Sequence, residues 1–202
     1  MKVILINGSS RKDGNTYLSL KECENTFKEE GVDAEIFWIG NQPVRGCIGC
    51  NACSKTKTGC VFKDDILEEL TTKMIEADGI IIGSPVYYAG PNGSLCALLD
   101  RAFYSCSKQL RYKPASAICV CRRSGGTATL DRLNKYFTIN QMPVISSIYW
   151  NILHGHEKGE VLQDSEGLQT MRMLARNMAF YLKNNKPIEL KTEKRIMTNF
   201  IR

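Results

Sequence analysis

Short apolar runs alternate with longer amphipathic segments along the chain, and this alternation constrains the fold more than any other feature. The apolar runs predict strands at 2–6, 33–39, 79–83, 115–121 and 143–147. Apolar residues at helical spacing predict helices at 16–30, 65–74, 94–110, 127–139 and 166–183. Asp65 and Glu68 form a candidate capping box for the second helix, and Ser94 is a candidate cap for the third.

Short, continuously apolar strands separated by helices are typical of a parallel sheet that is covered on both faces. The pattern therefore predicts an α/β fold, a doubly wound five-stranded parallel sheet with helices on both faces. Ligands of such open sheets bind beyond the carboxyl ends of the strands. The loops after the first, third, fourth and fifth strands are thus expected to share one site.

The length of 202 residues fits one domain, which we expect at 1–183. A cysteine-rich loop at 45–63 is inserted after the second strand, and a basic tail follows at 184–202. The tail could contact nucleic acid or anionic lipid, or it could pack on the domain or on a sister subunit. No helix-turn-helix and no basic aromatic patch is evident, so we expect no nucleic-acid partner.

Nine cysteines are an odd and high number for a chain without a recognisable signal peptide. We therefore expect no disulfide framework, and we expect the protein to reside in a reducing cytoplasm. No apolar run approaches the roughly 20 residues that a membrane span requires, so we expect no membrane association.

The segment after the first strand, NGSSRKDGNT at 7–16, predicts an anion site at a helix N-terminus. Hydroxyls and a guanidinium supply donors there, and the candidate residues are Ser9, Ser10, Arg11, Gly14, Asn15 and Thr16. The segment matches neither GxxxxGK[ST] nor GxGxxG, so it favours a terminal phosphate monoester. The alternative is an ordinary turn in which Asn15 or Thr16 caps the helix.

The loop after the third strand, at 83–94, contains two prolines and two adjacent tyrosines. Such a loop can hold a flat ring system, and the candidate residues are Pro85, Val86, Tyr87 and Tyr88. The alternative is that one tyrosine packs in the core.

Four cysteines of the inserted loop, Cys47, Cys50, Cys53 and Cys60, follow the spacing C-x2-C-x2-C-x6-C. Such compact runs hold iron–sulfur clusters. Zinc and free or redox-switching thiols remain alternatives. The other five cysteines are expected to be buried as small hydrophobic residues.

A long loop is expected to follow the fifth strand, and it contains both histidines of the chain. Trp150, Asn151 and His154 are candidates to wall the cofactor pocket, either of this chain or of a neighbouring subunit, and His154 is a candidate proton donor. The alternative is a surface histidine without a role.

Two segments, GSSRKDGNT and GSPVYYAGPNGSLCALLDR, resemble the NADPH-dependent FMN reductase group of flavodoxin-like proteins. The resemblance extends from residue 2 to about 183 and implies that the first segment binds the FMN phosphate and the second lines the isoalloxazine. It implies a third flavin loop after the fourth strand, with Arg122, Gly125, Gly126 and Thr127. The cysteine loop resembles the iron–sulfur flavoprotein branch, in which such a loop carries a [4Fe–4S] cluster.

The resemblance implies an FMN-dependent oxidoreductase that transfers electrons through bound FMN. A cluster would relay them to or from a ferredoxin-like carrier. The alternative is an NAD(P)H-dependent reductase of FMN, quinones, nitro- or azo-compounds that has no cluster. Family members are commonly dimers or tetramers, so a homodimer or homotetramer is expected.

Overall fold

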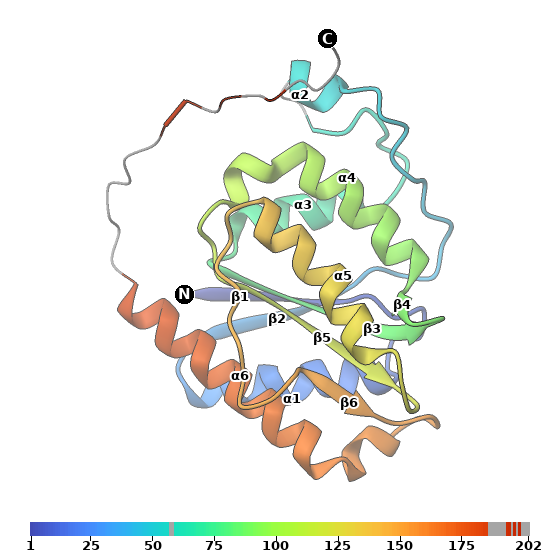
Figure 1. Cartoon of the computed structure of the whole chain (residues 1–202), viewed down its shortest axis with the longest axis vertical. Coiled ribbons are helices and arrows are strands. Elements are labelled where there is room, and N and C mark those ends of the chain that lie inside the picture. Colours follow the sequence, from blue (N-terminus) through green and yellow to red (C-terminus); the bar gives the residue numbers. More distant parts are fainter. Residues whose placement is uncertain (57–58, 186–192, 195, 197, 199–202) are drawn as a thin grey trace.

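The computed structural model describes all residues except 57–58, 186–192, 195, 197 and 199–202. Most of the expected basic tail therefore lies outside the described residues. The order of elements follows the predicted alternation of strands and helices (Figure 1).

A parallel sheet forms the centre of the domain, with the strand order β2-β1-β3-β5-β6. The parallel strands are β1 (Lys2–Asn7), β2 (Asp33–Trp38), β3 (Gly79–Tyr87), β5 (Ala115–Cys121) and β6 (Ile152–His154). A short strand, β4 (Gly90–Pro91), pairs antiparallel with the end of β3. The predicted α/β class is confirmed.

Helices cover both faces of this sheet. α1 (Asn15–Glu29) and α6 (Ser165–Asn184) cover one face, and α3 (Leu67–Glu76), α4 (Gly93–Leu110) and α5 (Gly126–Ile139) cover the other (Figure 1). Side chains of β1 alternate between the two cores, because successive strand residues point to opposite faces. Ile4 and Ile6 pack under α3 and α4, while Val3 and Leu5 pack under α1 and α6.

The expected fifth strand is wrong in position. Of 143–147, only Val144 forms a bridge to Ala115, and the strand itself is β6, eight residues further along the chain. Between them the chain leaves the sheet, and the Asn151 amide replaces the missing backbone ladder. Its Nδ2 donates to the Ser116 hydroxyl and to the Ala117 carbonyl, both at 3.0 Å.

Of the expected helix caps, Asp65 is confirmed at the start of α3, because its carboxylate accepts from the Leu67 N–H at 3.2 Å. The Glu68 half of the capping box and the Ser94 cap are wrong. The Glu68 carboxylate pairs with Lys63 at 2.9 Å, so it is not committed to a capping box. The Asn92 side chain caps α4 by accepting from the Ser94 N–H at 3.0 Å.

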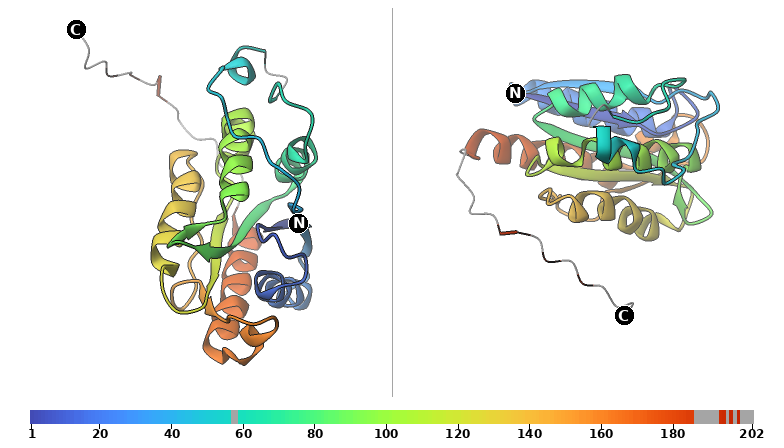
Figure 2. Two further views of the ribbon diagram at one scale, coloured as in Figure 1. Left: turned by 90° about the vertical axis from the view of Figure 1, so that its right-hand side faces the viewer. Right: turned by 90° about the horizontal axis from the view of Figure 1, so that it is seen from above.

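The segment between β2 and α3 runs outside the helical layer and passes beside α4 (Figure 2). It carries the short helix α2 (Ala52–Thr56), where a loop without regular structure was expected. The third strand also continues to Tyr87 and turns back as a hairpin with β4. No helix in the described part of the chain is long and apolar enough to cross a membrane.

Candidate functional site

A cavity of about 260 Å³ opens beyond the carboxyl ends of β1, β3 and β5. Four loops contribute to its wall, as expected for a doubly wound sheet. The lining residues are Ser9, Arg11, Gly14, Asn15, Thr16, Pro85, Val86, Tyr87, Val120, Arg122, Gly155 and His156. We call it the phosphate-loop cavity.

The first loop is held in shape by its own polar groups. The Asn7 side chain accepts from the Ser9 N–H, and the Ser9 hydroxyl accepts from the Arg11 N–H, both at 3.1 Å. The Trp38 indole N–H donates to the Ser9 carbonyl at 2.7 Å. These bonds fix the loop without using the N–H groups at the start of α1.

Gly14 is the N-cap of α1 and has no side chain to occupy the end of the helix. The first N–H groups of an α-helix have no acceptor within the helix, and the helix dipole favours an anion there. With the Arg11 guanidinium and the Thr16 side chain in the same wall, the site has the donor set that a phosphate monoester needs. The residues present therefore fit the phosphate end of FMN.

A strap from 155 to 159 closes one side of this cavity, and the sequence interpretation missed it. Asn15 Nδ2 donates to the Glu157 carbonyl at 2.9 Å, and its Oδ1 accepts from the Gly159 N–H at 2.8 Å. Lys158 and Asp13 form an ion pair at 2.5 Å across the same junction. The strap brings His156 to the cavity, whereas the sequence pointed to His154.

The tyrosine hairpin forms the other side. Neither tyrosine is buried: Tyr87 is about half exposed and Tyr88 fully exposed. Tyr88 and Ala89 both have positive φ, at 50° and 56°, a conformation that is uncommon for residues with side chains. A Cβ at Gly125 would lie 2.8 Å from the Ala89 Cα, so glycine there lets the loop after β5 approach the hairpin.

A second cavity of about 330 Å³ lies beyond the same loop. Its wall includes the other predicted site residues, Gly125, Gly126, Thr127, Trp150 and His154. The His154 N–H donates to the Asp164 carboxylate at 2.7 Å, and its ring Nδ1 lies 3.5 Å from the same oxygen. The structure thus distributes the predicted residues over two adjacent cavities. Ser10 and Tyr88 line neither of them, and Asn151 is buried in the sheet.

All four cysteines of the inserted loop line a third cavity, of about 390 Å³, against α4. Its wall consists of Cys47, Ile48, Gly49, Cys50, Asn51, Cys53, Cys60, Val61, Phe62, Asp100, Arg101 and Tyr104. Cys47 and Cys50 are exposed, and Cys53 and Cys60 are half-buried. Among the residues that the structure describes, no group of three or more His, Cys, Asp or Glu side chains is arranged to hold a metal ion.

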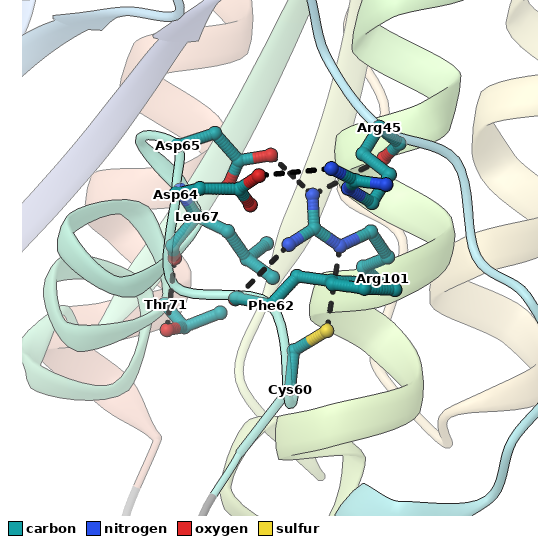
Figure 3. Close-up of polar contacts among 8 residues, drawn as sticks. All are labelled: Arg45, Cys60, Phe62, Asp64, Asp65, Leu67, Thr71 and Arg101. Atoms are coloured by element: carbon teal, nitrogen blue, oxygen red, sulfur yellow. Dashed lines mark hydrogen bonds and ion pairs between the residues drawn. The ribbon is translucent and has the colours of Figure 1, made fainter.

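The cavity nevertheless fits a thiolate-bound cluster by its donor set, because four cysteines line one space of about 390 Å³. A buried guanidinium, that of Arg101, forms part of the same wall (Figure 3). It donates to the Cys60 sulfur at 3.4 Å.

The five remaining cysteines lie apart from this cavity. Cys23, Cys106, Cys119 and Cys121 are buried, and Cys96 is half-buried. Burial raises the pKa of the Cys106 and Cys119 thiols to about 12, so neither is a ready nucleophile.

Comparisons with known proteins agree with this geometry. Residues 1–157 match the model of the NADPH-dependent FMN reductase family. Two iron–sulfur flavoproteins of Methanocaldococcus jannaschii are 37% and 36% identical, over 91% and 85% of this chain and 98% and 92% of theirs. The solved structure of an archaeal flavodoxin, 17% identical, covers 91% of this chain and 100% of its own with a TM-score of 0.62, which shows the shared fold. The chain therefore belongs to the NADPH-dependent FMN reductase family of flavin-dependent oxidoreductases, in its iron–sulfur flavoprotein branch.

Proposed function

We propose that this FMN-dependent oxidoreductase moves electrons between FMN in the phosphate-loop cavity and a [4Fe–4S] cluster in the cysteine cavity. When bound, FMN supplies one- and two-electron transfer and the cluster supplies one-electron transfer. The chain itself provides binding, orientation and the local charge. The proposed partners are NAD(P)H or a quinone, or a ferredoxin-like carrier, with the protein acting as a homodimer or homotetramer in the cytoplasm.

The first loop would bind the FMN phosphate. Donors at the start of α1, together with Arg11, would balance its charge, and the remaining contacts would come from Ser9, Gly14, Asn15 and Thr16. His156, which lies in the same wall, would add one more donor. The strap from 155 to 159 would exclude water from one side of the phosphate.

The tyrosine hairpin and the loop after β5 would orient the flavin ring. Pro85, Val86 and Tyr87 would line it from one side, and Arg122, Gly125, Gly126 and Thr127 would face its pyrimidine edge. Trp150 and His154 lie beyond the loop after β5, in the second cavity, and would serve the electron donor or acceptor. His154, held by Asp164, would then donate a proton to the reduced acceptor.

One observation carries the cluster proposal: all four cysteines of the C-x2-C-x2-C-x6-C segment line one cavity. Four thiols at this spacing beside one cavity supply the donor set that a thiolate-bound cluster requires. The names of the iron–sulfur flavoproteins that this chain resembles support the same proposal.

A second function is favoured by the exposure of Cys47 and Cys50 and by the absence of a preformed metal group among the described residues. In that case the protein is an NAD(P)H-dependent reductase of FMN, quinones, nitro- or azo-compounds, and the cysteines are free or redox-switching thiols. An FMN-dependent NADPH-azoreductase of Staphylococcus saprophyticus, 28% identical over 66% of each chain, supports this alternative.

The visible spectrum of protein purified without oxygen separates the two functions, together with its iron and acid-labile sulfide content. Flavin bands plus a broad shoulder that dithionite bleaches, with about four irons per chain, support the cluster. Flavin bands without iron support the second function, the NAD(P)H-dependent reductase. Protein that stays colourless after FMN is added contradicts both.

Two variants make the test specific. Cys50→Ala removes a proposed ligand and should abolish the shoulder while leaving the flavin bands. Cys96→Ala, which removes a half-buried cysteine outside the cavity, should change neither.

A further inference from the structure

We propose that Arg101 is the positioning residue of the cysteine cavity: it docks both ends of the cysteine loop on α4 and donates a hydrogen bond to the sulfur of Cys60. Through that bond it would raise the reduction potential of the cluster. The inference rests on the proposed function for the cluster and adds a residue that no sequence motif indicated.

Arg101 is the largest fully buried side chain of the domain, with 1% of the side chain exposed. A guanidinium so placed must find acceptors for its N–H groups, because an unpaired buried charge is strongly destabilising. It stays protonated at every pH at which the protein is folded.

The acceptors of Arg101 all belong to the segment that carries the cysteines. Nη1 donates to the Arg45 carbonyl at 3.1 Å and to the Asp65 carboxylate, and Nη2 donates to the Phe62 carbonyl at 3.2 Å. Nε donates to the Cys60 sulfur at 3.4 Å. Figure 3 shows the guanidinium at the centre of these partners.

These contacts join the two ends of the cysteine loop. Arg45 lies just before the first cysteine, and 60–65 contains the last cysteine and leads into α3. Arg101 lies in the part of α4 that precedes the kink at Cys106, and this part packs on the sheet, so the side chain has a fixed base from which to hold the loop. Arg101 therefore joins the start of the loop to the segment that contains Cys60 from the buried side, while the Arg45–Asp64 ion pair at 3.0 Å joins the same ends at the surface.

If Arg101 had only a structural role, its ion pair with Asp65 would be sufficient for that role. The Nε–H bond to Cys60 is what distinguishes a role toward the cluster. Hydrogen bonds to the sulfurs of a cluster and the local charge set its reduction potential. Reduction adds negative charge, so a donor and a positive charge at Cys60 stabilise the reduced form and raise the potential.

The test compares two variants of the anaerobically purified protein. Asp65→Asn/Arg101→Gln removes both buried charges together, so neither is left unpaired, and it removes the Nε–H donor. Arg45→Gln is the comparison variant, because it removes the exposed Arg45–Asp64 ion pair between the same loop ends but keeps the Arg45 backbone carbonyl and the Nε–H bond from Arg101 to Cys60. Each is measured for iron release to a chelator and for the midpoint potential of the cluster in a dye-mediated titration.

We expect the double variant to release iron about 10- to 100-fold faster, the scale on which residues that hydrogen-bond to metal ligands act. We also expect its midpoint to move to lower potential by more than in the comparison variant. A midpoint equal to that of the comparison variant overturns the inference, even if the double variant is less stable.

A third readout is independent of the cluster. In iron-free protein, amides at 45–56 and 59–65 should exchange with deuterium faster in the double variant than in Arg45→Gln. If the unaltered protein holds no iron, the proposed cluster function fails, and unchanged exchange then overturns the docking role of Arg101 as well.

Discussion

Asn15 and Gly159 lie 144 residues apart in sequence, and the Asn15 side chain accepts the Gly159 N–H at 2.8 Å. The same amide donates to the Glu157 carbonyl, so one side chain at the start of α1 fastens the strap over the phosphate-loop cavity. Asn15 therefore couples the shape of the strap to the site at which the phosphate is proposed to bind.

Asn15→Ala should release the strap and weaken FMN binding. The variant loses both hydrogen bonds to the strap, and a net loss of about 1.4 kcal/mol of binding free energy corresponds to about a tenfold loss of affinity. The affinity for FMN is measured by titrating the FMN-free protein with FMN and following the flavin fluorescence. Asn134→Ala, on α5 away from the cavity, is the control. Equal affinities in the two variants would show that the strap does not contribute to binding.

Gly155→Ala should act on the same strap by a steric route. A Cβ there would lie 2.8 Å from the Val161 nitrogen and 3.0 Å from Asn15 Nδ2. Because the first of these is backbone, the strap must move, and overpacking of this kind costs about 1–3 kcal/mol. Urea denaturation should show that loss of stability, with weaker FMN binding. Gly93→Ala, where a Cβ meets nothing within 4 Å, should be close to neutral.

Variants of the two histidines should affect FMN binding and catalytic turnover separately. His156 lines the phosphate-loop cavity, and His154 lines the second cavity against Asp164. His156→Ala should weaken FMN binding about fivefold, the value of one neutral hydrogen bond. His154→Ala should leave FMN binding unchanged and slow acceptor reduction about 100-fold, as expected for loss of a proton donor.

Each histidine variant is the control for the other, provided that steady-state rates are measured with FMN saturating. The opposite result, in which His154→Ala loses FMN and His156→Ala only slows turnover, would reverse the proposed roles. Unchanged turnover in His154→Ala would leave this histidine without a catalytic role.

The sequence predicted the parallel sheet correctly because its signal is local. The run Val3–Ile6 is apolar at every position, which is typical of a strand that is buried on both faces. The position of the fifth strand could not be predicted. It depends on hydrogen bonds from the Asn151 side chain that take the place of backbone pairs. Such bonds leave no hydrophobic pattern in the sequence.

The site could be predicted only where its residues follow one another in the chain. The phosphate loop and the four cysteines are contiguous motifs, so their types and spacing were informative. Arg101 was missed because a charged residue in a helix ordinarily faces solvent. Its burial depends on acceptors 36 to 56 residues earlier in the chain. The strap was not predicted from the sequence for the same reason, because it is held by hydrogen bonds to Asn15, which lies far away in the chain.

Stability at acid pH should depend on Glu35, which accepts from Lys2 and Lys73 at the edge of the sheet. Hydrogen bonds from Lys2 and then Lys73 hold the pKa of the Glu35 carboxyl below its ordinary value of 4.5. Because the folded-state pKa is the lower one, this carboxylate stabilises the fold above about pH 4.5, and the gain disappears as the pH falls through the folded-state pKa. The partly exposed cluster contributes at most about 1 kcal/mol. Glu35→Gln should therefore be less stable than the unaltered protein at pH 7 and equal to it at pH 2.5 in urea denaturation. Asp131→Asn, whose carboxylate forms no ion pair with the described residues, should show no such difference, and an equal loss in both variants would contradict the assignment.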